Sequence, residues 1–103
     1  MAEVGLVCFA QVALEVARAA LPPYRSKLSK RVFTQPQLLA ILCLMRYEGW
    51  TFREAEVRPG EPEELRRALG LGPVPDFTTL NRSLHRLPEE VLARALEETV
   101  RRL

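Results

Sequence analysis

Cysteine, histidine and glycine are scarce in this chain of 103 residues, which contains two cysteines, one histidine and five glycines. Cys8 and Cys43 lie in apolar runs without a CxxC spacing, so neither a zinc site nor a disulfide framework is indicated. We interpret both cysteines as small buried hydrophobes. No glycine-rich loop suited to cradling a phosphate occurs either. The sequence therefore predicts no metal and no cofactor.

Recognisable catalytic patterns are also lacking. There is no serine-nucleophile motif, and nothing beside His85 suggests a catalytic role for it. The acidic residues lie at expected caps or in first and last helical turns, where helix dipoles and solvation explain them. We expect that the chain is not an enzyme.

Long hydrophobic segments are absent. Residues 4–21 are rich in Val, Leu and Ala, but Glu3 precedes them and Gln11 and Glu15 interrupt them, which is unlike a secretory signal. The run 38–45 is far shorter than the roughly 20 residues that cross a bilayer. We expect no membrane association and a cytoplasmic location.

What the chain does contain favours one helical domain. Apolar residues make up 48% and charged residues 27%, a globular balance, and no period-two strand pattern occurs. We predict an all-α fold: a compact bundle of five to six helices in a single domain, 1–103. It consists of an apolar first helix (1–21), a central region (22–87) and a C-terminal helix (88–103).

Capping residues and helix-breaking residues predict where the helices begin and end. Pro22 and Pro23 end the first helix, and residues 24–32 form a loop or arm. Thr34 with Gln37, and Thr51 with Glu54, have the spacing of capping boxes. Gly49, Gly70 and Pro88 mark further ends. The predicted helices are 2–21, 34–49, 51–57, 63–69, 76–87 (capped by Asp76 or Thr78) and 88–102.

Positive and negative charge are segregated along the chain. Residues 18–31 contain five basic side chains and no acidic one, whereas residues 53–65 contain five glutamates against two arginines. Basic side chains on an arm are suited to binding phosphates. The candidate phosphate contacts are Arg25, Lys27, Lys30 and Arg31.

The predicted helix 76–87 has the composition of a groove-binding element. Leu80, Leu84 and Leu87 form an apolar stripe, and no acidic residue faces the other side. Asparagine and arginine are able to make bidentate contacts to bases. The candidate DNA-binding residues on this helix are Thr78, Thr79, Asn81, Arg82, His85 and Arg86.

The order of helices from 51 to 86 is compatible with a helix-turn-helix whose last helix enters the major groove. Four blocks carry a resemblance: FTQPQLLA (33–40), EGWTFRE (48–54), LRRALGL (65–71) and VPDFTTL (74–80). Their order and spacing resemble the N-terminal helical domain of bacterial insertion-sequence transposases, more narrowly the InsH-type group with a DDE catalytic domain. The resemblance covers about residues 21–87.

The resemblance implies a domain that helps to bind the terminal inverted repeats of a transposable element. In such transposases a catalytic domain with three metal-binding carboxylates follows, and this sequence shows no scaffold for two-metal chemistry. The apolar first helix also departs from the family pattern. We therefore expect a truncated transposase that recognises element ends in double-stranded DNA without catalysing transposition.

A second hypothesis remains open. The apolar first helix and the last helix are also compatible with a protein-interaction module. Such a module would form a homodimer or associate with a full-length transposase, and in the latter case it would inhibit that enzyme through mixed oligomers.

Overall fold

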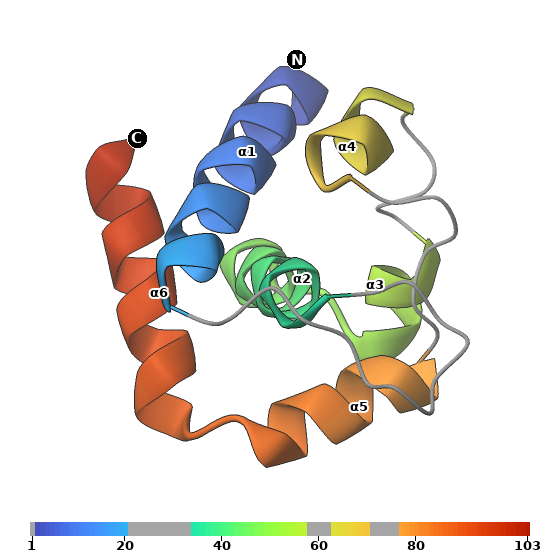
Figure 1. Ribbon diagram of the computed structural model, residues 1–103. Coiled ribbons are helices and arrows are strands. Elements are labelled where there is room, and N and C mark those ends of the chain that lie inside the picture. The colour runs from blue at the N-terminus through green and yellow to red at the C-terminus, as the bar shows by residue number, and fades with distance from the viewer. Residues whose placement is uncertain (1, 21–33, 58–62, 71–76) are drawn as a thin grey trace.

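The computed structural model describes residues 2–20, 34–57, 63–70 and 77–103. These residues form six helices and, within the described ranges, no strand (Figure 1). The predicted all-α bundle of five to six helices is confirmed. The helices are α1 (Ala2–Ala20), α2 (Gln35–Glu48), α3 (Phe52–Val57), α4 (Glu63–Ala68), α5 (Phe77–Arg86) and α6 (Glu89–Arg102).

Helix α2 lies at the centre of the bundle (Figure 1). It contacts α1, α3, α5 and α6, and all residues from Leu39 to Met45 are buried. Helix α1 packs on α2, α4 and α6, while α5 packs on α2 and α3 at the opposite end of the bundle. The chain thus holds α5 against the core on one side and leaves its other side at the surface.

The capping residues act as the sequence predicts. The Thr34 hydroxyl accepts a hydrogen bond from the Gln37 amide (3.3 Å), and the Gln37 side chain accepts one from the Thr34 amide (2.9 Å). Thr51 and Glu54 repeat this exchange at 3.2 and 2.9 Å. Each box satisfies two backbone donors that the first helical turn leaves free.

Two boundaries near α5 differ from the prediction. Helix α5 begins at Phe77, so Thr78 lies inside the helix and is not its cap, and Asp76 lies outside the described residues. Pro88 is the N-cap of α6, with φ −60° and ψ 140°, whereas we expected it as the first helical residue. Its extended backbone turns the chain sharply between α5 and α6.

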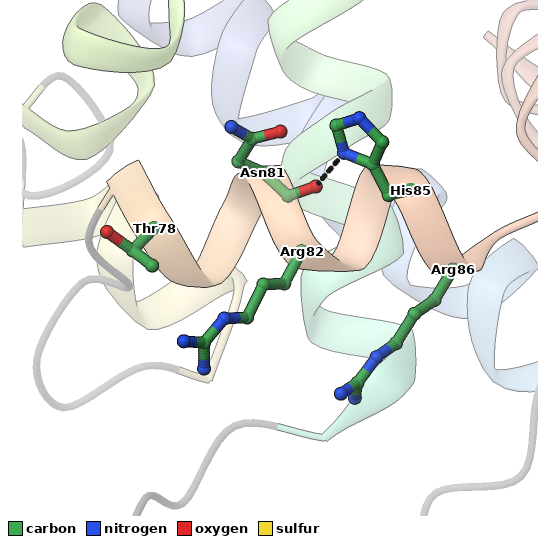
Figure 2. Close-up of a pocket in the computed structure, with 5 residues that line it drawn as sticks. All are labelled: Thr78, Asn81, Arg82, His85 and Arg86. Atoms are coloured by element: carbon green, nitrogen blue, oxygen red, sulfur yellow. Dashed lines mark hydrogen bonds between the residues drawn. The ribbon is translucent and has the colours of Figure 1, made fainter.

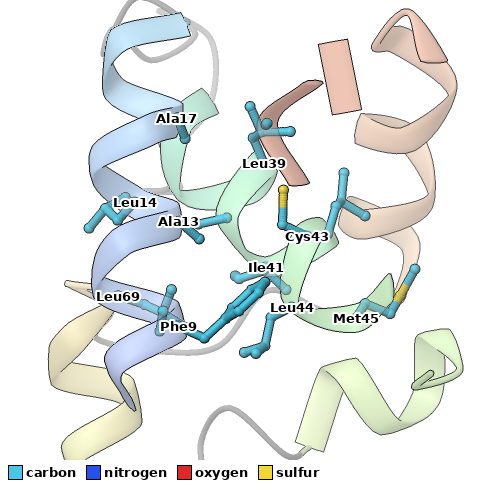
Figure 3. Packing of buried hydrophobic residues seen from close by; sticks show 14 of the residues in the cluster. Phe9, Ala13, Leu14, Ala17, Leu39, Ile41, Cys43, Leu44, Met45 and Leu69 are labelled. Atoms are coloured by element: carbon cyan, nitrogen blue, oxygen red, sulfur yellow. The ribbon is translucent and has the colours of Figure 1, made fainter. Parts of the chain in front are cut away.

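The core is built around α1 and α2 (Figure 3). Phe9, Ala13 and Ala17 are buried against α2, where Leu39 and Cys43 are completely buried. The small alanines let the two helices approach closely. The apolar residues of the first helix are therefore used for packing within this chain.

Cys8 contradicts our expectation that both cysteines are buried. It is exposed, together with Gln11, Glu15 and Arg18 on the same side of α1. These positions recur at intervals of three and four residues, so they form one surface stripe of the helix. Apolar neighbours in the sequence did not bury Cys8, because they point to other sides of α1.

The last helix exposes an apolar side chain and buries a polar one near its C-terminal end. Val100 of α6 is 47% exposed. Thr99 is buried instead, and its hydroxyl donates a hydrogen bond of 2.6 Å to the carbonyl of Ala95. This bond satisfies the hydroxyl, so a threonine is tolerated in the core.

Candidate nucleic-acid interface

Helix α5 is anchored through its leucines. Leu80 is completely buried, and Leu84 and Leu87 are half-buried against the core. The apolar stripe predicted from the sequence therefore faces inward. Because successive residues of a helix are about 100° apart, the residues between these leucines are directed outward.

The outward side of α5 carries the polar residues that the sequence singled out. Five of the six candidates on this helix line one hollow of about 320 Å³: Thr78, Asn81, Arg82, His85 and Arg86 (Figure 2). Thr79, the sixth candidate, is half-buried and does not line the hollow. No acidic residue occurs in α5.

Arg82 and Arg86 are exposed and form no ion pair with the described part of the chain. Other arginines behave differently: Arg46 pairs with Glu89, and Arg67 pairs with Glu63 one turn earlier. Like charges four residues apart on a helix repel by about 0.2–0.5 kcal/mol. Helix α5 therefore places two cations, four residues apart, at the surface without an acidic partner in the described ranges.

His85 is fixed to the backbone of its own helix. Its Nδ1 lies 2.9 Å from the carbonyl oxygen of Asn81. A carbonyl oxygen only accepts hydrogen bonds, so Nδ1 carries the proton and donates it. The Nε2 atom is then an acceptor in the neutral ring. Sequence reasoning missed this bond, although the four-residue spacing of the two positions makes it possible.

The helix-turn-helix expected from the sequence stays a prediction, although its first and last helices are in contact. Helix α3 packs on α5, and both contact α2. Helix α4 lies between them in the sequence but packs on α1 (Figure 1). Helices α2 and α3 thus form the support on which α5 packs.

The second half of the predicted DNA site lies elsewhere in the chain. Arg25, Lys27, Lys30 and Arg31 fall outside the described residues, so their place relative to α5 stays a prediction. In the described ranges, no group of three or more His, Cys, Asp or Glu side chains could hold a metal ion. None of the described helices is long and apolar enough to cross a membrane.

The surface of α5 thus combines exposed cations, an amide and an imidazole on a helix that is held by its opposite side. This combination is chemically suited to an anionic partner with hydrogen-bonding groups. Comparisons of the chain with known protein families, curated proteins and solved structures found no match.

Proposed function

We propose that this domain binds double-stranded DNA through α5. The single observation that carries the proposal is the outward side of α5, where Arg82 and Arg86 are exposed without acidic partners in the described ranges. An isolated helix surface of this kind fits the major groove, which is about 12 Å wide and admits one α-helix.

The proposed target rests on the sequence resemblance. The four blocks that resemble insertion-sequence transposases support the proposal that the domain recognises the terminal inverted repeats of such an element. Two of these blocks contain the capping boxes that position α2 and α3. In this proposal the domain supplies recognition and does not itself catalyse strand transfer.

A titration with DNA tests the proposal. A labelled duplex carrying the terminal inverted repeat of an InsH-type element is titrated with the protein and followed by fluorescence anisotropy at several salt concentrations. Affinity should fall steeply with salt, because bound phosphates release counterions. A scrambled duplex of equal length is the control. Equal affinity for both would remove the claim of specificity, and no binding to either would remove the claim of DNA binding.

The second hypothesis, a protein-interaction module, is supported by an apolar surface that is smaller than the polar surface of α5. The apolar side of α1 is occupied by α2, α4 and α6. Among the described residues, the end of α6 carries two exposed apolar side chains, Val100 and the C-cap residue Leu103. A second copy of the chain would dock on these residues. Sedimentation at high concentration distinguishes the two cases, because a strictly monomeric chain contradicts self-association through α6.

A further inference from the structure

The five residues of the hollow on α5 fall into two groups. Asn81 and His85 lie along one flank of the helix, and Arg82 and Arg86 lie along the other, with Thr78 between them near the start (Figure 2). The helical spacing of 100° per residue gives the same division. The two groups therefore face different parts of any ligand that covers the hollow.

We infer that Arg82 and Arg86 bind backbone phosphates of the DNA, whereas Asn81 and His85 contact base edges and determine specificity. This inference rests on the proposed function and assigns a separate role to each flank. The sequence-based expectation placed all four residues in the groove and allowed both asparagine and arginine to contact bases, so this inference is narrower.

The arginine flank has the chemistry of a phosphate contact. The Cβ atoms of side chains four residues apart on a helix are separated by about 5–6 Å. Two exposed guanidinium groups at this spacing repel each other until anions neutralise them, and guanidinium binds phosphate oxygens in a bidentate manner. A guanine edge is uncharged and would leave that repulsion in place. Phosphates therefore neutralise Arg82 and Arg86, which bases cannot do.

The other flank has the chemistry of base recognition. Asn81 is short and half-buried, so a ligand must approach the helix closely to reach its amide, as a base edge does in the major groove. An asparagine amide pairs with N6 and N7 of adenine. The hydrogen bond from His85 to the Asn81 carbonyl fixes the imidazole beside it. In the neutral ring, its Nε2 accepts from an exocyclic amino group of adenine or cytosine.

A selection from random DNA tests the division. The probe is a pool of duplexes with a randomised 12-base-pair centre, from which the protein-bound fraction is recovered and sequenced. The variants are Asn81→Ala and the double variant Arg82→Gln/Arg86→Gln. The control is Arg18→Gln/Arg94→Gln, which removes the same charge from two exposed arginines on α1 and α6 that form no ion pair with the described residues.

The native protein should enrich a motif containing adenine. Asn81→Ala should lower the preference at one position by about 5- to 150-fold while the salt dependence stays the same. The double arginine variant should keep the motif, bind all duplexes more weakly, and lower the slope of log affinity against log salt by about 1.8, or 0.9 per phosphate. The control should reproduce the native slope and motif.

Three results would overturn the inference. One is a changed salt slope in Asn81→Ala, and another is loss of a guanine preference in the double arginine variant. The third is a uniform loss of affinity in both variants with the motif kept. If the native protein binds no duplex, the proposed function itself fails and the division of α5 fails with it. Matching circular dichroism melting curves show that each variant is folded.

Discussion

Arg46 at the end of α2 forms a bidentate ion pair with Glu89 at the start of α6. The Nη1–Oε2 distance is 2.7 Å and the Nη2–Oε1 distance is 3.2 Å. The two residues are 43 positions apart in the sequence, so the pair joins α2 to the first turn of α6 directly after the turn at Pro88. It also holds α6 against the helix on which α5 packs.

This pair predicts a pH-dependent contribution to stability. The hydrogen bond and charge of Arg46 hold the pKa of Glu89 below its ordinary value of 4.5. A carboxylate with a lowered pKa stabilises the fold above that ordinary value, and the contribution is lost as the pH falls through the lowered pKa. Glu89→Gln should therefore lower the melting temperature at pH 7, and the difference from the native protein should shrink in acid.

Glu90→Gln is the matched control for this experiment. Glu90 is exposed in the same first turn of α6 and interacts similarly with the helix dipole, but no ion pair links it to the described residues. Its effect on melting should be smaller than that of Glu89→Gln at pH 7. Equal effects from both substitutions would show that Arg46 contributes nothing beyond the dipole.

Replacing each of three glycines by alanine should change the stability of the fold in a different way. Gly5 lies inside α1 with open space around it, so Gly5→Ala should stabilise the fold by about 0.5–1 kcal/mol. Gly49 also has open space, but its φ of +72° is left-handed, and alanine there should cost about 1–2 kcal/mol. Gly70 has a φ of +68°, and a Cβ at this position would lie 3.3 Å from Nε2 of Gln37.

Gly70→Ala should therefore be more destabilising than Gly49→Ala. The Gln37 amide donates hydrogen bonds to the carbonyls of Leu69 (3.1 Å) and Gly70 (2.8 Å), which join the end of α4 to the start of α2. A new methyl group would push against this side chain. Urea unfolding of the three alanine variants measures the order, and equal costs at positions 49 and 70 would show that Gln37 moves aside without penalty.

The two cysteines should differ in reactivity. Cys43 is completely buried, and burial raises the pKa of its thiol to about 12, whereas Cys8 is exposed. Because the thiolate is the reactive form, only Cys8 should react rapidly with an aromatic disulfide reagent at pH 8. In the native protein, one thiol should react rapidly. In the Cys8→Ser variant no thiol should react rapidly, and in the urea-unfolded protein both thiols should do so. Two fast thiols in the native state would contradict the packing of α2.

Leu80 should anchor the proposed interface. Its side chain is completely buried under α5, so Leu80→Ala should cost about 2–5 kcal/mol in urea unfolding. Val57→Ala is the control, since Val57 is 56% exposed and its truncation should change stability by less than about 0.5 kcal/mol. Similar losses in the two variants would mean that α5 is not held by Leu80.

Local signals in the sequence predicted much of this fold. Thr34 and Gln37 form their capping box because each side chain needs only a partner three residues away. The leucine stripe of α5 likewise follows from helical periodicity, so the outward position of Asn81 and Arg82 was predictable. These features depend on short-range geometry, which residue spacing records directly.

Long-range packing was not predictable in the same way. The pairing of Arg46 with Glu89 joins helices that are distant in the sequence, and no spacing rule connects them. The packing of α4 on α1 was missed for the same reason. The exposure of Cys8, in contrast, follows from local spacing, because Cys8 continues the surface stripe of Gln11, Glu15 and Arg18 on α1.

An NMR titration tests the central claim, that α5 is the DNA-binding element. Backbone amide shifts of the ¹⁵N-labelled protein are followed while an unlabelled duplex is added at low salt. We expect the largest shifts at residues 78–86, with Arg82 and Arg86 side-chain signals moving at the same DNA concentration. Shifts concentrated on the exposed side of α1 or on α6, with α5 unchanged, would contradict the account.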